Sequence, residues 1–333
     1  MCSQDFLIQN DELIRYLGTD TEVAVPNTVK MINKGAFYNC TDVTSVTLPD
    51  GLVEIEQHAF HGCSRLVTLT IPRNVMRIGY WAFQGCAGLT EIKVCDQNPE
   101  YSTDENGALY DKEKRTLICF PPGSRIADPV VAQGVWFIGT YAFGGCTNLK
   151  KIRLPDSLCR IDNEAFFGCE GLTEIHLPEG LEEIGYDAFC RCASLTSVVI
   201  PDKTWVGKGA FAACKSLTEF IVSEQNRHCS VDEFGVLFDK QKETLISYPI
   251  GNTRTDYTIP DGVREIMRFA FLRNAHLTSV TLPVSLKQVC WSAFRRCGNL
   301  RLVRYHGTEE QFKNIDFARG NEDLLRTERI VCG

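Results

Sequence analysis

Three features of the sequence predict a solenoid of stacked coils, an α/β-type repeat fold that is mostly β with short 3₁₀ and turn segments. The string Ala-Phe-x-x-Cys recurs along the chain, its cysteines lie 23 residues apart over long stretches, and apolar residues keep fixed places between the strings. A period of this length is typical of folds in which each unit packs only on its neighbours. The eight copies are Ala36–Cys40, Ala59–Cys63, Ala82–Cys86, Ala142–Cys146, Ala165–Cys169, Ala188–Cys192, Ala210–Cys214 and Ala293–Cys297, and a ninth, Ala270–Asn274, has Asn in place of Cys.

One unit reads Leu-x-x-Ile-x-Leu-Pro-x-x-Leu-x-x-Ile-x-x-x-Ala-Phe-x-x-Cys, with a clear copy from Leu172 to Cys192. Ile175 and Leu177 alternate with polar residues, which predicts a strand with one buried face. Pro178 ends this strand because proline has no N–H to donate. The remainder of the unit is too short for a helix of mean length and is predicted to be short strand, 3₁₀ or turn. Twelve strands of the first kind are predicted, from Val23–Val25 to Val303–Tyr305.

The apolar residues of one unit cannot be buried within that unit, so neighbouring units are expected to stack. Each strand then pairs in parallel with the next, and each Phe lies on the Phe of the coil before it. Because burial of such a ring contributes about 1.5–3 kcal/mol, truncation of Phe166 to Ala is expected to cost about 3–5 kcal/mol of stability.

Two insertions that match each other interrupt the period. The segments Gly107–Lys112 and Gly235–Lys240 align at an offset of 128 residues, and each is predicted to form a β-hairpin. The predicted organisation is a hairpin cap at residues 1–22, a solenoid at 23–305 with insertions at about 96–128 and 224–256, and a carboxy-terminal cap at 306–333. In that last cap, Thr308 and Gln311 have the spacing of a capping box at a helix start, and a final strand is expected near Ile330–Val331.

Charge and hydropathy limit the classes of partner. The net charge of -7 argues against binding to a nucleic-acid backbone, and no apolar run approaches the roughly 20 residues that span a bilayer. The first residues have neither a basic region nor an apolar core typical of a secretory signal. The chain as given is therefore predicted to be a cytoplasmic monomer, with the cell surface or secretion as the alternative if the native amino terminus is trimmed.

The repeat, its Ala-Phe-x-x-Cys signature and the hairpin insertions resemble the BspA-like leucine-rich-repeat family of bacterial proteins, over about Val23 to Tyr305. The resemblance implies a right-handed leucine-rich-repeat solenoid with a parallel concave sheet. It also implies a protein-binding role, with adhesion to host proteins or other cells as the family's typical activity. It supplies no catalytic residue and no cofactor.

The sixteen cysteines are interpreted as mainly buried thiols, with disulfides as the less favoured alternative. Stacked cysteines fall within disulfide range, but their parallel Cβ directions suit the S–S dihedral poorly, and free Cys is often buried. No Cys-x-x-Cys pair is present, and His58, His61 and Cys63 lack the further ligands of a zinc site. Catalytic motifs are also absent. We therefore predict no metal, no cofactor and no catalysis, keeping as alternatives a hydrolase or metal site near an insertion and a structural or self-associating spacer.

Residues on either side of the inward Ile or Leu of each strand are expected to face the concave side, where we predict the contact surface for a protein partner of unknown identity. The hairpin tips, with Tyr110 and Phe238, are a second candidate surface, although packing of these rings on the flank of the solenoid is favoured. The predicted protein-binding residues are Glu91, Lys93, Lys151, Arg153, Glu174, His176, Ser197 and Glu219.

Overall fold

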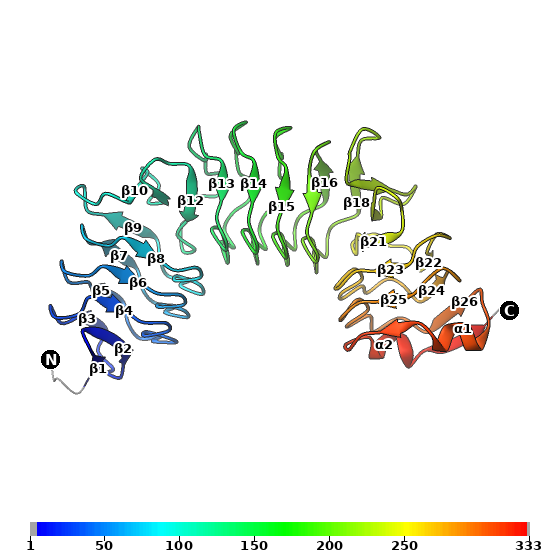
Figure 1. The fold of residues 1–333 in the computed structure, drawn as a ribbon, viewed down its shortest axis with the longest axis horizontal. Coiled ribbons are helices and arrows are strands. Elements are labelled where there is room, and N and C mark those ends of the chain that lie inside the picture. The colour runs from blue at the N-terminus through cyan, green and yellow to red at the C-terminus, as the bar shows by residue number, and fades with distance from the viewer. Residues whose placement is uncertain (1–4, 332–333) are drawn as a thin grey trace. The chain divides into compact units, whose positions relative to one another are not determined.

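A computed structural model describes residues 5–331, which fold into stacked β coils (Figure 1). The chain divides into two compact units, Met1–Cys169 and Glu170–Gly333. Each regular coil has one longer strand and, on its other side, a strand of two residues. The predicted solenoid of mostly β structure is confirmed, and the described residues form helix only near the carboxy-terminal end of the second unit.

In the first unit, the long strands pair in parallel so that equivalent residues of successive coils are neighbours, as with Val23 and Val46 or Leu69 and Ile92. An antiparallel hairpin, β1 (Phe6–Gln9) and β2 (Glu12–Tyr16), precedes the short strands and pairs with the first of them. The long strands are β3 (Glu22–Ala24), β5 (Ser45–Thr47), β7 (Thr68–Ile71) and β9 (Glu91–Val94). The short strands are β4 (Met31–Ile32), β6 (Glu54–Ile55), β8 (Arg77–Ile78), β13 (Phe137–Ile138) and β14 (Arg160–Ile161).

The second unit repeats this arrangement with the same parallel registers. Its long strands are β16 (Ser197–Ile200), β18 (Glu219–Val222), β22 (Asp256–Thr258), β24 (Ser279–Leu282), β26 (Leu302–Tyr305) and β28 (Glu328–Val331). Its short strands are β15 (Glu183–Ile184), β17 (Trp205–Val206), β23 (Glu265–Ile266), β25 (Gln288–Val289) and β27 (Asp316–Phe317).

Each insertion is an antiparallel meander of three strands, one strand more than the predicted hairpin. The first comprises β10 (Tyr101–Thr103), β11 (Leu109–Asp111) and β12 (Thr116–Cys119), and the second comprises β19 (Cys229–Val231), β20 (Leu237–Asp239) and β21 (Thr244–Ser247). A buried Asn starts each meander. The amide of Asn98 donates to the carbonyl of Pro72 and its oxygen accepts from the N–H of Tyr101, and Asn226 makes the equivalent bonds.

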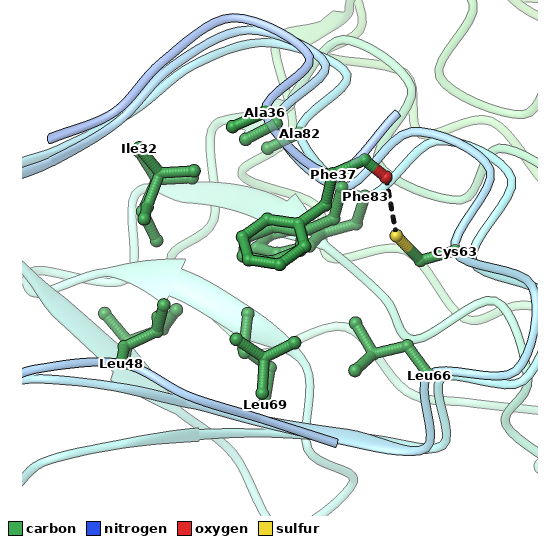
Figure 2. Packing of buried hydrophobic residues seen from close by; sticks show 14 of the residues in the cluster. Ile32, Ala36, Phe37, Leu48, Cys63, Leu66, Leu69, Ala82 and Phe83 are labelled. Carbon is green, nitrogen blue, oxygen red and sulfur yellow. Dashed lines mark hydrogen bonds between the residues drawn. The ribbon is translucent and has the colours of Figure 1, made fainter. Parts of the chain in front are cut away.

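The core is a row of stacked aromatic rings that runs along each unit. Phe37 lies on Phe60 with ring centroids 5.1 Å apart, and Phe143 lies on Phe166 at 4.9 Å. Alanines and branched aliphatic residues surround this row (Figure 2). The stacking predicted from the repeated Phe is therefore confirmed.

The repeat cysteines extend this core with hydrogen bonds between coils. The thiol of Cys63 donates to the carbonyl of Phe37 in the coil before it, at 3.1 Å (Figure 2). Cys86, Cys169, Cys214 and Cys297 do the same. Burial raises the pKa of the Cys297 thiol to about 12, which keeps it protonated and able to donate. All cysteines among residues 5–331 are free thiols, as expected, and Cys2 and Cys332 lie outside the described residues.

Two residues of every Ala-Phe-x-x-Cys copy have a left-handed backbone, the one before Ala and the one before Cys. Glycine adopts this conformation readily, but Trp81, Tyr141 and Phe269 also hold it, with φ of 56°, 61° and 64°. Bonds between coils fix it: the N–H of Tyr141, for example, donates to the carbonyl of Asn163. These turns point bulky side chains outward from the short-strand side.

Three of the twelve predicted strands, those expected around Val130, Ile152 and Ile175, do not form. Val130 and Arg153 make a single bridge, because Pro129 has no N–H with which to extend the ladder. Residues 172–178 form no strand, although Ile175 is buried as predicted.

The carboxy-terminal segment begins a helix where the capping residues predicted one. Helix α1 (Glu309–Lys313) has Thr308 as N-cap, and the reciprocal bonds of a capping box join Thr308 and Gln311. The chain continues through a second short helix, α2 (Glu322–Leu325), which the sequence analysis did not predict, and ends in β28, which pairs in parallel with β26.

Candidate functional site

The exposed residues beside the buried positions of the long strands, and at the equivalent positions of the coils in which that strand does not form, are called the long-strand face. In the first unit, Glu91 and Lys93 lie on β9, exposed and ion-paired at 3.2 Å. Lys151 and Arg153 are exposed outside any strand, and Arg153 is 3.5 Å from Asp128. All four predicted residues of this unit are thus accessible.

The first insertion separates these two pairs. The N–H of Ile92 donates to the carbonyl of Gly107, so the insertion loop stands beside β9 where the next long strand would otherwise pair. A Cβ on Gly107 would lie only 3.1 Å from the side chain of Glu91. Glu91 and Lys93 therefore do not form one continuous patch with Lys151 and Arg153.

In the second unit the other four predicted residues accompany an apolar pair that strand alternation also places on this face but that is not among the predicted binding residues. Ser197 and Glu219 are register partners on β16 and β18. Two positions along, Val199 and Ile221 are also partners, and their side chains are 56% and 46% exposed. Glu174 and His176, in the preceding coil of the same unit, are exposed as well. The pair differs from the rest of the face because two β-branched residues occupy positions that are polar or charged in most other coils.

Each insertion also interrupts the ladder of short strands on the other side of the coils. We call the interruption between β8 and β12 the first break, and that between β17 and β21 the second break. At the first break the N–H of Ile78, in the last strand of its ladder, donates to the hydroxyl of Tyr101 at 3.0 Å instead of to a following short strand. The first break contains a pocket of about 260 Å³.

Aromatic residues from both sides of the first break line this pocket, and an ion pair stands at its edge. Trp81 belongs to the coil before the insertion, and Phe137 and Tyr141 to the coil after it. Arg160 holds Asp162 at 2.6 Å, with its guanidinium 4.9 Å from the centre of the Phe137 ring. Burial raises the pKa of Asp162 although Arg160 opposes the rise, and burial raises the pKa of Tyr141 to about 12.

A row of outward-facing rings leads to the pocket from the earlier coils. Tyr38 stacks on His61 at 4.7 Å, and His58 stacks on Trp81 at 5.4 Å. Burial is the main cause that lowers the pKa of His58, with the neighbouring His61 as a second cause. The row joins three successive coils on the short-strand side of the first unit.

The second break is filled by its own side chains. Arg268 reaches across it to form an ion pair with Asp187, and one guanidinium nitrogen lies 3.3 Å from the carbonyl oxygen of Lys208. The guanidinium lies 5.2 Å from the centre of the Phe269 ring. Burial raises the pKa of Asp187, and Arg268 opposes the rise.

The other residues considered from the sequence are the two hairpin aromatics and the His58, His61 and Cys63 group. Tyr110 and Phe238 are buried, so packing against the solenoid is confirmed and exposed hairpin tips are ruled out. His58 and His61 contact each other edge to face, while Cys63 points into the core. Residues 5–331 contain no cluster of three or more His, Cys, Asp or Glu side chains that fits a metal ion. Over the same range, no helix has the length and apolar character needed to cross a membrane.

Comparison with known proteins identifies the repeat. The sequence pattern of the BspA type leucine-rich repeat region matches six times, over residues 16–113, 136–237 and 251–322. No curated protein gives a significant match.

Several solved structures share the fold. A leucine rich cell surface protein from Faecalibacterium prausnitzii is 26% identical over 89% of this chain, with a TM-score of 0.51. The match spans 62% of that protein, less than two thirds of its length. The pneumococcal vaccine antigen PcpA matches at 18% identity over 95% of this chain and 68% of its own, with a TM-score of 0.59. A leucine-rich repeat protein from Eubacterium ventriosum matches at 19% identity over 93% and 87%, with a TM-score of 0.54.

Proposed function

The chain belongs to the BspA type leucine-rich repeat family, and we propose that it is a protein-binding module that acts through its long-strand face. Repeats of this kind stack into extended surfaces that suit contact with another protein. The likeness to a cell surface protein at 26% identity supports a role at the cell surface.

The observation that carries the proposal is the exposed pair Val199 and Ile221. β-branched side chains that point into water on neighbouring strands gain by being covered, and each is about half exposed. Polar and charged residues surround them, with Ser197 and Glu219 in register on the same two strands. A small apolar centre with a polar rim is the usual composition of a protein interface.

The other predicted residues lie on the long-strand face of one unit or the other. Glu174 and His176 belong to the coil before β16, whereas Glu91, Lys93, Lys151 and Arg153 lie on the long-strand face of the first unit. Charges of both signs on the long-strand face of the first unit favour a partner with a mixed surface, and such charges affect the rate of association more than the final affinity.

The experiment is capture of partners by the immobilised full chain from extracellular-matrix and cell-lysate proteins, followed by affinity measurement with each captured protein. Val199→Glu/Ile221→Glu places charges at the centre of the surface and is expected to weaken binding at least about thirtyfold. Val67→Glu is the matched control, since Val67 is 47% exposed and lies just before β7 rather than on a strand.

Two further variants test the charged residues of each unit separately, Lys151→Ala/Arg153→Ala in the first and Glu174→Ala/His176→Ala in the second, and a variant that alters the contact surface is expected to reduce the association rate more than it raises the dissociation rate. Unchanged affinity in Val199→Glu/Ile221→Glu, with folding intact by circular dichroism, would rule out this face as the contact surface. Absence of any partner would instead favour a spacer role.

The alternative of a hydrolase near an insertion gains no support from the described residues. Cys119, which lines the pocket of the first break, is buried, and burial raises its pKa to about 12. A thiol with that pKa is not an effective nucleophile at neutral pH.

A further inference from the structure

The two breaks are equivalent places in the fold. At the offset of 128 residues, Thr140 corresponds to Arg268, Tyr141 to Phe269, and Trp81 to Gly209. The carbonyl groups correspond as well: that of Tyr80 accepts from the N–H of His58 at 3.3 Å, and that of Lys208 accepts from the N–H of Asp187 at 3.3 Å. The side chain of Arg268 is therefore an internal example of what this site holds.

In the second break Arg268 has three kinds of partner. Its guanidinium pairs with the carboxylate of Asp187, lies against the Lys208 carbonyl, and lies over the rings of Phe269 and Tyr186 at 5.2 and 5.9 Å. Carboxylate, carbonyl and aromatic face together suit a planar cation.

The first break offers the same three kinds of group without an arginine of its own at this position. Thr140 is much shorter than Arg268, and the pocket of about 260 Å³ opens beside it. Tyr141 stands in the place of Phe269, and Trp81 adds a second large ring at the wall. The carboxylate comes from a different coil in the two breaks. Asp162 follows β14, one coil beyond that of Tyr141, whereas Asp187 lies in the coil before Gly209, where the counterpart in the first unit is His58.

We propose that the pocket of the first break receives an arginine side chain from a protein partner on the short-strand side of the first unit, an inference that rests on the proposed protein-binding function and adds a second face to it. Arginine is favoured over lysine because its flat guanidinium stacks between rings and donates in several directions at once. The side chain of Arg160 is 44% exposed, so its contact with Asp162 can shift to leave one carboxylate oxygen for the incoming group. The net charge of -7 favours a partner segment that carries positive charge.

The test uses a small probe, so it does not depend on knowing the partner. The full chain is titrated with Nα-acetyl-arginine amide, and binding is followed by the fluorescence of Trp81, with Trp81→Phe to assign the signal. Saturable binding is expected, and the uncharged citrulline analogue is expected to bind at least about tenfold more weakly because it loses the cation–π and charge-assisted contacts.

Two variants locate the site. Thr140→Arg fills the pocket from within, as Arg268 fills the second break, and is expected to abolish probe binding. Thr41→Arg, the same change at an exposed threonine, leaves binding intact. Asp162→Asn is expected to weaken binding about tenfold or more, and it serves as the independent variant if Thr140→Arg lowers the melting temperature.

Equal binding of the citrulline analogue, unchanged binding in Thr140→Arg, or no saturable binding overturns the inference. These results leave the proposed function intact, since it is measured on a captured partner with Val199→Glu/Ile221→Glu. Conversely, probe binding with no captured partner removes the proposed function and retains an arginine-binding pocket.

Discussion

The first and second breaks show how one framework gives an open site in one place and a closed one in another. Both follow a long strand, both begin with a buried Asn, and both continue into a three-stranded meander. The difference lies in the side chains that project from the turns. Thr140 and Trp81 leave a pocket in the first break, whereas Arg268 crosses the second break above Gly209.

The two breaks show that the repeat fixes the backbone conformation of the turns, while the side chains at the turn positions vary. Trp81 and Gly209 both have a left-handed backbone, with φ of 56° and 73°. A tryptophan in this conformation is strained relative to glycine, so Trp81 carries a cost that Gly209 does not. The residue before Ala is left-handed in every copy of the repeat, so this conformation is imposed by the stacking of the coils and is independent of the pocket.

The largest loss of stability is expected from truncating the stacked rings that lie beneath each break, in the core of its own unit. Phe143→Ala and Phe271→Ala each remove a fully buried ring from the stack and are expected to lower the free energy of unfolding by about 3–5 kcal/mol. Urea denaturation followed by circular dichroism measures both. A large difference between the two losses would show that the breaks differ in their core and not only in their turns.

A smaller loss of stability is expected when the ion pair that closes the second break is removed. In Arg268→Met, the largely buried carboxylate of Asp187 loses its partner, which is expected to cost about 2–3 kcal/mol. The double variant Asp187→Asn/Arg268→Met removes the stranded charge and should recover part of that loss. If Arg268→Met were as stable as the wild type by urea denaturation, the ion pair would not be what closes this break.

Removing the Tyr101 hydroxyl at the first break is expected to cost less stability than breaking the ion pair. Tyr101→Phe leaves the N–H of Ile78 without its acceptor, which costs about 1–2 kcal/mol if water does not replace it. Hydrogen exchange of the Ile78 amide is the direct measurement, with faster exchange expected in the variant. Tyr38→Phe is the control, since Tyr38 is an exposed tyrosine at the far end of the ring row.

The fold could be predicted from the sequence because the residues that are buried in each coil recur at a fixed spacing. The spacing of Ala, Phe and Cys predicted the coils, the stacked rings and the free thiols, and Thr308 with Gln311 predicted the start of α1. The left-handed turns escaped notice because glycine occupies only some of them and Trp81, Tyr141 and Arg191 occupy others. Contacts between coils impose that conformation, so the local sequence does not reveal it.

The candidate sites were less predictable for a related reason. The eight long-strand residues could be named because strands alternate, but their division by the first insertion depends on the contact of Gly107 with β9. The pocket of the first break depends on residues from Ile78 to Asp162 that meet only when an insertion interrupts the ladder. No short motif marks such a place.

The smallest expected effect is a dependence of stability on pH that both breaks share. Burial, the largest cause at each site, raises the pKa of Asp162 and of Asp187 above the ordinary value of 3.8, although each carboxylate has an arginine partner. The folded chain therefore binds more protons than the unfolded chain between pH 3.8 and the raised pKa, so stability falls as pH rises through that window. Asp162→Asn and Asp187→Asn should each remove part of this fall, measured as the free energy of unfolding from pH 3.5 to 7. A wild-type curve that instead rises more steeply than both variants would mean that the arginines outweigh burial, and that the two breaks are held by their charges.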